Sequence, residues 1–104
     1  MSPTPARNPR VLLVEDDAAI MSIMVRYLGA SGYETEAVES VAAALRSFAA
    51  ERPAIIVTDI FFESGDDGFS LIEEVRARDW RFVGLGLMVL ALLGGSVVLA
   101  LRPN

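Results

Sequence analysis

Two apolar runs that end in acidic residues constrain the fold of this chain more than any other feature of its sequence. The first run, residues 11–14, leads directly into the three acids of residues 15–17, and the second, residues 54–58, leads into Asp59. No charged residue interrupts either run, so each predicts a strand that is buried on both faces of a sheet. If the two strands are parallel neighbours, Asp16 and Asp59 converge at the carboxyl edge of the sheet, where open α/β sheets bind ligands.

The chain up to residue 78 alternates between strand and helix patterns. Strands are predicted over 10–14, 33–38 and 54–58, and helices from Asp17 to a stop at Gly29 and Gly32, over 41–51 and over 69–78. Apolar residues at three- and four-residue intervals predict the buried helix faces: Ile20, Ile23, Met24, Tyr27 and Leu28, then Val41, Leu45 and Phe48, then Phe69, Ile72 and Val75. Asp16 or Asp17 is expected to cap the first helix, and Ser40 the second. This order of elements predicts right-handed crossovers and a parallel α/β sheet.

Missing residue types narrow the chemistry that the chain can perform. The 104 residues include no Cys, no His and no Lys, so all nine basic residues are Arg. Disulfides, thiolate metal ligands and imidazole bases are therefore excluded. The net charge of −5 argues against a nucleic-acid partner.

The last part of the chain has a different character. Residues 82–101 form a stretch of 20 residues without a charge, which as a helix would span about 30 Å, the thickness of the hydrocarbon core of a bilayer. Trp80 and Arg81 precede the stretch and Arg102 follows it, as anchors at a membrane interface do. The length favours a transmembrane helix, and the excess of Arg before it predicts that the preceding part is cytoplasmic. The alternative is a buried core made of a fourth strand, a glycine turn and a fifth strand.

These patterns divide the chain into three parts. Residues 1–9, which include three Pro, are predicted to be a flexible lead-in, residues 10–79 the α/β domain, and residues 80–104 an apolar tail. Small residues recur at four-residue spacing within the tail, a pattern that allows two membrane helices to pack together. The abrupt change after Asp79 leaves a further alternative open, in which the start of one domain is joined to an unrelated tail.

The acids at the two strand ends define a candidate metal site. Like charges about 4 Å apart repel by roughly 4 kcal/mol at an effective dielectric constant of 20, and a divalent cation removes that cost. Oxygen ligands without His or Cys select a hard ion such as Mg²⁺. A carboxylate beside the ion can attack phosphorus and form an aspartyl phosphate. Taken singly, each acid is more readily explained as a solvated loop charge or a helix cap.

These residues resemble the receiver domain of two-component response regulators over residues 10–78. Val-Leu-Leu-Val-Glu-Asp-Asp is similar to the family's first strand with its acidic pair, and Val-Thr-Asp-Ile to its third strand with the phospho-accepting aspartate. Asp67-Gly68 resembles the turn that opens the family's third helix. The resemblance implies a flavodoxin-like (CheY-like) parallel α/β fold of which three βα units are present, and a signalling domain rather than an enzyme.

The resemblance also implies the roles of the site residues. Asp59 is the implied nucleophile, and Mg²⁺ is the implied cofactor, held by Glu15, Asp16, Asp59 and the backbone carbonyl of Phe61. The implied phosphoryl donor is a phosphohistidine on a sensor histidine kinase. Together with the tail, this predicts a cytoplasmic receiver that is anchored in the inner or plasma membrane through residues 82–101. The small residues of the tail would allow two copies to associate there.

The chain departs from the family pattern in the groups that contact the phosphoryl group. The family places a Lys after its fifth strand, and this chain has none. The family's hydroxyl residue after strand four falls on Leu93 if residues 89–93 form that strand. The family's strand order is 2-1-3-4-5. If the tail is a membrane helix and supplies no fourth and fifth strand, the third strand is left at an exposed edge. A second hypothesis is therefore a degenerate receiver that is not phosphorylated and acts as a membrane-tethered interaction module, and a third is a truncated gene product.

Overall fold

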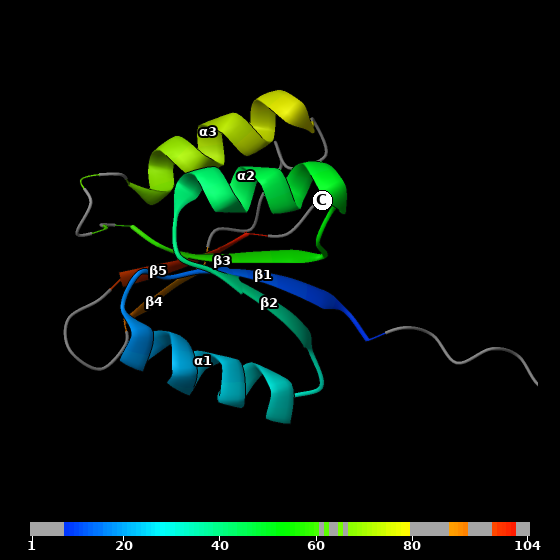
Figure 1. Cartoon of the computed structure of the whole chain (residues 1–104), viewed down its shortest axis with the longest axis vertical. Coiled ribbons are helices and arrows are strands. Elements are labelled where there is room, and N and C mark those ends of the chain that lie inside the picture. Colours follow the sequence, from blue (N-terminus) through cyan, green and yellow to red (C-terminus); the bar gives the residue numbers. More distant parts are fainter. Residues whose placement is uncertain are drawn as a thin grey trace, which may run out of the picture.

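Strands and helices alternate through most of the chain in the order that the sequence predicts (Figure 1). The computed structural model describes residues 8–60, 62, 65, 67–79, 88–91 and 97–101. The elements are β1 (Arg10–Val14), α1 (Ala18–Ala30), β2 (Glu34–Val38), α2 (Val41–Ala50), β3 (Ile55–Asp59), α3 (Gly68–Arg78), β4 (Met88–Ala91) and β5 (Val97–Leu101). Strand β1 lies between β2 and β3 and is parallel to both, so the predicted parallel arrangement of these three strands is confirmed.

The register of β1 against β3 decides where the acids lie. Val11 is opposite Ile55 and Val14 is opposite Thr58. Both strands therefore end at the same edge of the sheet, where Glu15, the residue after β1, lies close to Asp59, the last residue of β3.

The apolar runs are continuous because both faces of the sheet are covered. Helix α1 packs on one face, and α2 and α3 pack on the other (Figure 1). Val11 and Leu13 are buried on the α1 side, and Leu12 and Val14 on the side of α2 and α3. Side chains that alternate along a strand point to opposite faces, so a strand between two helix layers needs apolar residues at every position.

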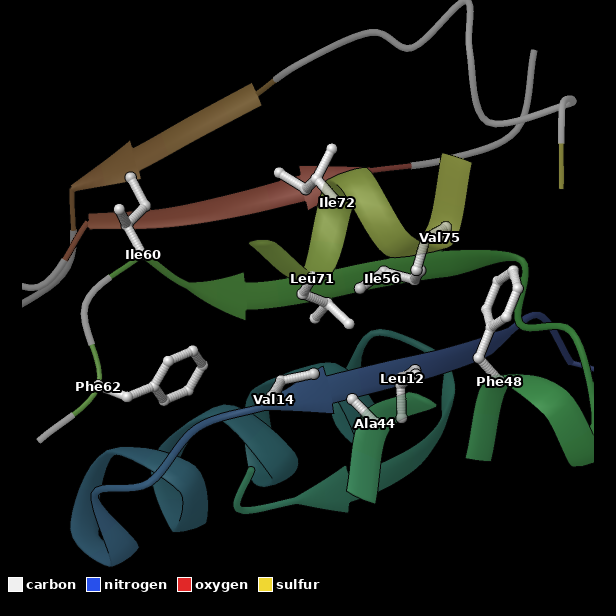
Figure 2. Close-up of a cluster of buried hydrophobic side chains, with 10 residues drawn as sticks. All are labelled: Leu12, Val14, Ala44, Phe48, Ile56, Ile60, Phe62, Leu71, Ile72 and Val75. Atoms are coloured by element: carbon white, nitrogen blue, oxygen red, sulfur yellow. The ribbon is translucent and has the colours of Figure 1, made fainter. Parts of the chain in front are cut away.

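The larger of the two cores lies between the sheet and helices α2 and α3. Figure 2 shows its ten buried residues: Leu12, Val14, Ala44, Phe48, Ile56, Ile60, Phe62, Leu71, Ile72 and Val75. Phe48 is the largest of the fully buried side chains. Val41 and Leu45, which the sequence predicts on the inner face of α2, pack against this core as expected.

Side-chain caps fix where the three helices begin. The Asp17 carboxylate accepts hydrogen bonds from the N–H groups of Ala19 and Ile20, at 2.9 and 3.0 Å. Ser40 caps α2 and Asp67 caps α3 in the same way, each through an N–H group three residues later. Of the two acids predicted as alternatives for α1, Asp17 is thus the cap, and Asp16 lies with Glu15 and Asp59 in the acidic cluster.

Three apolar residues that the spacing assigns to buried helix faces are instead exposed. Ile23, Tyr27 and Phe69 have exposed fractions of 60%, 72% and 51%. Helix α1 carries apolar residues on more than one flank, and the sheet covers only the flank that contains Met24. Periodicity alone finds an apolar helix but cannot choose which of two apolar flanks the sheet reaches.

The described residues of the apolar tail form two further strands of the sheet, β4 and β5. Strand β5 pairs antiparallel with β3, and β4 pairs antiparallel with β5, which gives the order β2-β1-β3-β5-β4. Strand β3 is therefore not an edge strand. The mixed sheet replaces the all-parallel arrangement that the family order predicts.

The transmembrane helix predicted over 82–101 is not found among the described residues of that range, which are the strands β4 and β5. Residues 82–87 and 92–96, including Leu93, lie outside the described residues, as do Trp80, Arg81 and Arg102. In the part of the chain that the structure describes, no helix has the length and hydropathy that crossing a bilayer requires. Valines at 89, 97 and 98 favour extended backbone. The side of β3 away from β1 offers β5 hydrogen-bonding partners, and β5 in turn pairs with β4.

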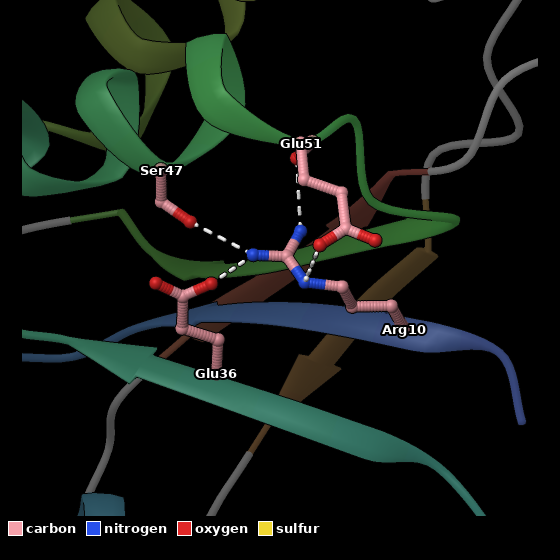
Figure 3. A network of polar contacts seen from close by, with 4 residues as sticks. All are labelled: Arg10, Glu36, Ser47 and Glu51. Atoms are coloured by element: carbon pink, nitrogen blue, oxygen red, sulfur yellow. Dashed lines mark hydrogen bonds and ion pairs between the residues drawn. The ribbon is translucent and has the colours of Figure 1, made fainter.

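A polar network at the amino end of β1 ties α2 to the sheet (Figure 3). The Arg10 guanidinium donates to the Glu51 carbonyl at 2.9 Å and to the Ser47 hydroxyl at 3.0 Å, and it pairs with the Glu36 carboxylate of β2. A second ion pair joins Arg10 Nε to the Glu51 carboxylate at 3.7 Å. This network lies at the opposite end of β1 from the acids, so it stabilises the fold away from the candidate site.

Candidate functional site

Three carboxylates converge at the carboxyl edge of the sheet. One oxygen from each of Glu15, Asp16 and Asp59 lies within 4.8 Å of the others. Glu15 and Asp59 are buried, with exposed fractions of 1% and 7%, and Asp16 is half-buried. The structure thus brings together the side chains of all three acids that the sequence predicts as metal ligands. The fourth predicted ligand, the carbonyl of Phe61, lies outside the described residues.

Backbone pairing holds Glu15 in place at the end of β1. Its N–H group donates to the Val38 carbonyl at 3.0 Å, which extends the pairing of β1 with β2 by one residue. Its Oε1 accepts a hydrogen bond from the N–H of Asp17 at 3.0 Å. Its Oε2 is buried and has no hydrogen-bond partner. A buried carboxylate oxygen without a partner is costly, and a bound cation is one way to remove that cost.

Burial raises the pKa of Glu15 above its ordinary value of 4.5, and the nearby carboxylates of Asp59, Asp16 and Asp17 raise it further. The hydrogen bond from the Asp17 N–H acts in the opposite direction but does not outweigh them. Because the pKa is higher in the folded chain, the folded state holds the Glu15 proton more tightly than the unfolded state does. The stability gained in this way is complete below pH 4.5 and is lost as the pH rises through the folded-state pKa.

Glu15→Gln is therefore expected to raise the free energy of unfolding at pH 7 in the presence of a chelator, by about 1–2 kcal/mol, because it removes a buried charge and an unpaired oxygen. The gain should shrink toward zero below pH 4.5, where Glu15 is itself neutral. Urea unfolding at both pH values measures the change. Glu73→Gln is the control, since Glu73 is exposed on α3. A gain at pH 7 no greater than that of the control would contradict the argument.

Asp59 is the last residue of β3. Its side chain is buried, and hydrogen bonds hold the main chain around it in place. The Thr58 hydroxyl, fully buried, donates to the Asp59 carbonyl at 2.9 Å. The next carbonyl, that of Ile60, accepts a hydrogen bond from the N–H of Gly68 at 2.7 Å. The start of α3 thus lies directly against the residue that carries the buried carboxylate.

Two parts of this arrangement are not evident from the sequence. The apolar run includes Thr58, whose hydroxyl the pattern does not distinguish, and the resemblance gives Asp67-Gly68 only as the turn that opens the third helix. Asp67 is the residue that caps this helix. The signal that could have located the contact is the Asp-Gly pair itself, because Gly next to a helix start permits close approach of another backbone.

The donor set of the cluster fits a magnesium ion. All three side chains offer carboxylate oxygens, and Mg²⁺ takes oxygen ligands in an octahedral arrangement, with water and phosphate oxygens in the remaining positions. The unpartnered Oε2 of Glu15 is a further reason for a cation at this place. The residues present therefore match the cofactor that the resemblance implies.

Comparisons with known proteins agree with this fold and site. A family model for the response regulator receiver domain matches residues 11–91. The transcriptional regulatory protein PrrA of Mycobacterium tuberculosis is 40% identical over 76 residues, which cover 73% of this chain and 32% of that protein. The photosynthetic apparatus regulatory protein RegA of Rhodobacter capsulatus is 34% identical over 68 residues, which cover 65% of this chain and 36% of that protein. The chain thus spans about a third of the length of these curated relatives.

Solved structures show the same likeness. The N-terminal domain of a response regulator receiver protein from Methanoculleus marisnigri JR1 has a TM-score of 0.63 and 25% identity, over 68% of this chain and 57% of that one. A sensor protein from Polaromonas sp. JS666 has a TM-score of 0.64 and 32% identity, over 69% of this chain and 57% of that one. With most of the chain inside the family match and three acids gathered at the expected edge of the sheet, this chain belongs to the response regulator receiver domain family, a family of two-component signalling domains and not of enzymes.

Proposed function

We propose that this chain accepts a phosphoryl group on Asp59 in a two-component phosphorelay, with Mg²⁺ bound by Glu15, Asp16, Asp59 and the carbonyl of Phe61. The observation that supports this most directly is the convergence of the three carboxylates within 4.8 Å at the end of β1 and β3. Membership in the receiver family supports the same function. The proposed partner is a sensor histidine kinase.

The proposed step is a substitution at phosphorus. A carboxylate oxygen of Asp59 attacks the phosphorus of a phosphohistidine, the P–N bond breaks, and its electron pair returns to the imidazole nitrogen. The product is an acyl phosphate on Asp59 and a free histidine on the kinase. When bound, Mg²⁺ supplies positive charge next to the transferring phosphoryl group. Glu15 and Asp16 would hold the ion beside Asp59, while burial of the Asp59 side chain limits the access of water to the reacting carboxylate.

Labelling with a small phosphoryl donor tests this proposal. Incubation of the chain with acetyl phosphate and Mg²⁺ is expected to give one phosphoryl group per chain, stable in acid and released by hydroxylamine, as an acyl phosphate is. A chelator should prevent the labelling, because the three carboxylates then repel the incoming phosphate. The measurement is intact mass with and without hydroxylamine. A chain that takes no such label with Mg²⁺ present, from acetyl phosphate or from a phosphorylated kinase, would not be a phosphoryl acceptor.

A second candidate function is an interaction module without phosphoryl chemistry. The observation that favours it is the absence of Lys from the whole sequence, since the family uses a Lys to contact the phosphoryl group. Such a module would bind a kinase or another copy of the chain through its surface and would take no label. The labelling experiment separates the two functions. A further proposal is that residues 82–101 insert into a membrane instead of completing the sheet, and the fraction of the chain that sediments with membranes tests it.

A further inference from the structure

Gly68, the first residue of α3, lies closer to the main chain of Asp59 than a residue with a side chain can. A Cβ atom built on Gly68 would lie 2.4 Å from the carbonyl oxygen of Asp59 and 3.2 Å from both the Asp59 carbonyl carbon and the Ile60 Cα. Real Cβ atoms essentially never approach another heavy atom within 3.0 Å. Any side chain at this position would therefore have to displace the peptide that joins Asp59 to Ile60.

The need for glycine at this position is one of space and not of backbone conformation. Among the described glycines, the left-handed region of φ is occupied by Gly32 and Gly65, and not by Gly68. Gly29, a glycine within α1, has no heavy atom within 4 Å of the place where its Cβ would lie. The two helical glycines thus differ in what surrounds them, while an Ala is compatible with the backbone of either.

The peptide that a side chain would strike has little freedom to move. The Thr58 hydroxyl donates to the Asp59 carbonyl at 2.9 Å, and the Gly68 N–H donates to the Ile60 carbonyl at 2.7 Å. Asp59 is also paired in the sheet, opposite Val98 of β5. A shift of the Asp59 carbonyl must therefore break one of these contacts or carry Asp59 itself away from Glu15 and Asp16.

We propose that Gly68 is a positioning residue for the acidic cluster. Because it has no side chain, α3 can lie against the peptide after Asp59, and this contact sets the place of the Asp59 carboxylate relative to Glu15 and Asp16. The inference rests on the proposed function, in which those three carboxylates hold Mg²⁺ and Asp59 accepts the phosphoryl group. Gly68 acts through Asp59 and does not itself touch the ion or the phosphoryl group.

A small displacement at Asp59 is expected to have a large effect on the site. Raising the Cβ contact from 2.4 Å to the 3.0 Å limit requires a movement of about 0.6 Å. Magnesium demands nearly ideal octahedral geometry, with ligands at about 2.0–2.1 Å, and a functional site loses activity when its groups move by more than about 0.5 Å. The site should therefore respond to a single methyl group at position 68.

Gly68→Ala and Gly29→Ala, compared with the wild type, test this inference. Gly68→Ala is expected to raise the Kd for Mg²⁺ at least tenfold and to slow labelling by acetyl phosphate at least tenfold at a Mg²⁺ concentration that saturates the wild type. Gly29→Ala should leave both quantities within twofold of the wild type. Calorimetry gives the Kd, and intact mass against time gives the labelling rate. Circular dichroism establishes that the variants are folded, and trimethylamine N-oxide is added to all three proteins if Gly68→Ala is only partly folded.

The outcomes separate this inference from the function on which it rests. If the wild type and Gly29→Ala bind Mg²⁺ and take label while a folded Gly68→Ala does so equally well, Gly68 is a packing residue and the inference is overturned, but the proposed function stands. If the wild type takes no label, the proposed function fails and the inference fails with it. A Gly68→Ala chain that stays unfolded even with the osmolyte also overturns the inference, because the close contact then serves the whole fold and not the carboxylate cluster.

Discussion

Asp59→Asn is expected to abolish phosphorylation while the chain stays folded. The amide has the same shape as the carboxylate but is neutral and is a poor nucleophile, so the rate of labelling by acetyl phosphate should fall by at least about 10³-fold, as it does when an enzyme loses its nucleophile. Asp59 is buried beside two other carboxylates, so the loss of its charge should not destabilise the fold in the absence of a metal. Intact mass before and after hydroxylamine measures the label, and urea unfolding measures the stability.

The matched control for this prediction is Asp17→Asn. Asp17 lies next to the cluster in sequence, but its side chain is exposed and caps α1. Asn is as good a helix cap as Asp, so this variant removes one negative charge near the site without removing the cap. It should keep most of the labelling rate. Undiminished label in Asp59→Asn would mean that the phosphoryl group is attached to another residue. Equal losses of label in both variants would mean that only the net charge of the site matters.

Much of the fold could be predicted because local and global preferences agree along this chain. The uninterrupted apolar runs before Glu15 and Asp59 indicate strands that are covered on both faces, and the structure has them adjacent and parallel. Asp17 and Ser40 begin helices as cap residues should. Where cap, periodicity and turn point to the same element, the sequence leaves few alternatives.

The predictions that the structure does not bear out fall where the sequence is compatible with two structures. Helix α1 has two apolar flanks, and only contact with the sheet decides that Ile23 and Tyr27 remain exposed. An apolar stretch such as 82–101 satisfies the length rule for a membrane helix and also contains residues that favour strands. Strand β5 pairs with β3, and β4 in turn pairs with β5, and a local sequence pattern does not contain the long-range contact between β5 and β3.

The acids of the site were predictable, but the groups that position them were not. Glu15, Asp16 and Asp59 could be identified because each follows the end of an apolar run. The contact between Gly68 and the Asp59 peptide depends on how α3 packs against the sheet, and the lack of a partner for the Glu15 Oε2 depends on what surrounds it in the folded chain. Such contacts join residues that are distant in the sequence, so they require coordinates.

Phe48→Ala is expected to cost about 3–5 kcal/mol of unfolding free energy. Phe48 is fully buried between α2 and the sheet, among Leu12, Ile56, Leu71 and Val75 (Figure 2). The Arg52 guanidinium also lies 4.1 Å from the centre of its ring, and it pairs with the buried Asp79 at the end of α3. Loss of the ring would therefore leave a cavity and also remove the surface on which Arg52 rests.

Phe69→Ala is the control, because it makes the same substitution at a residue that is 51% exposed. It should cost no more than about 1 kcal/mol, since little buried area is lost and no closed cavity forms. Domains of this size are stable by only about 5–15 kcal/mol and bury a smaller share of their surface than larger ones, so Phe48→Ala should remove a large fraction of the total stability. Urea unfolding of the two variants gives the comparison directly. Equal costs at the two positions would mean that α2 does not close the core over the sheet, and the acids at the sheet edge would then lack the rigid support on which the proposed chemistry depends.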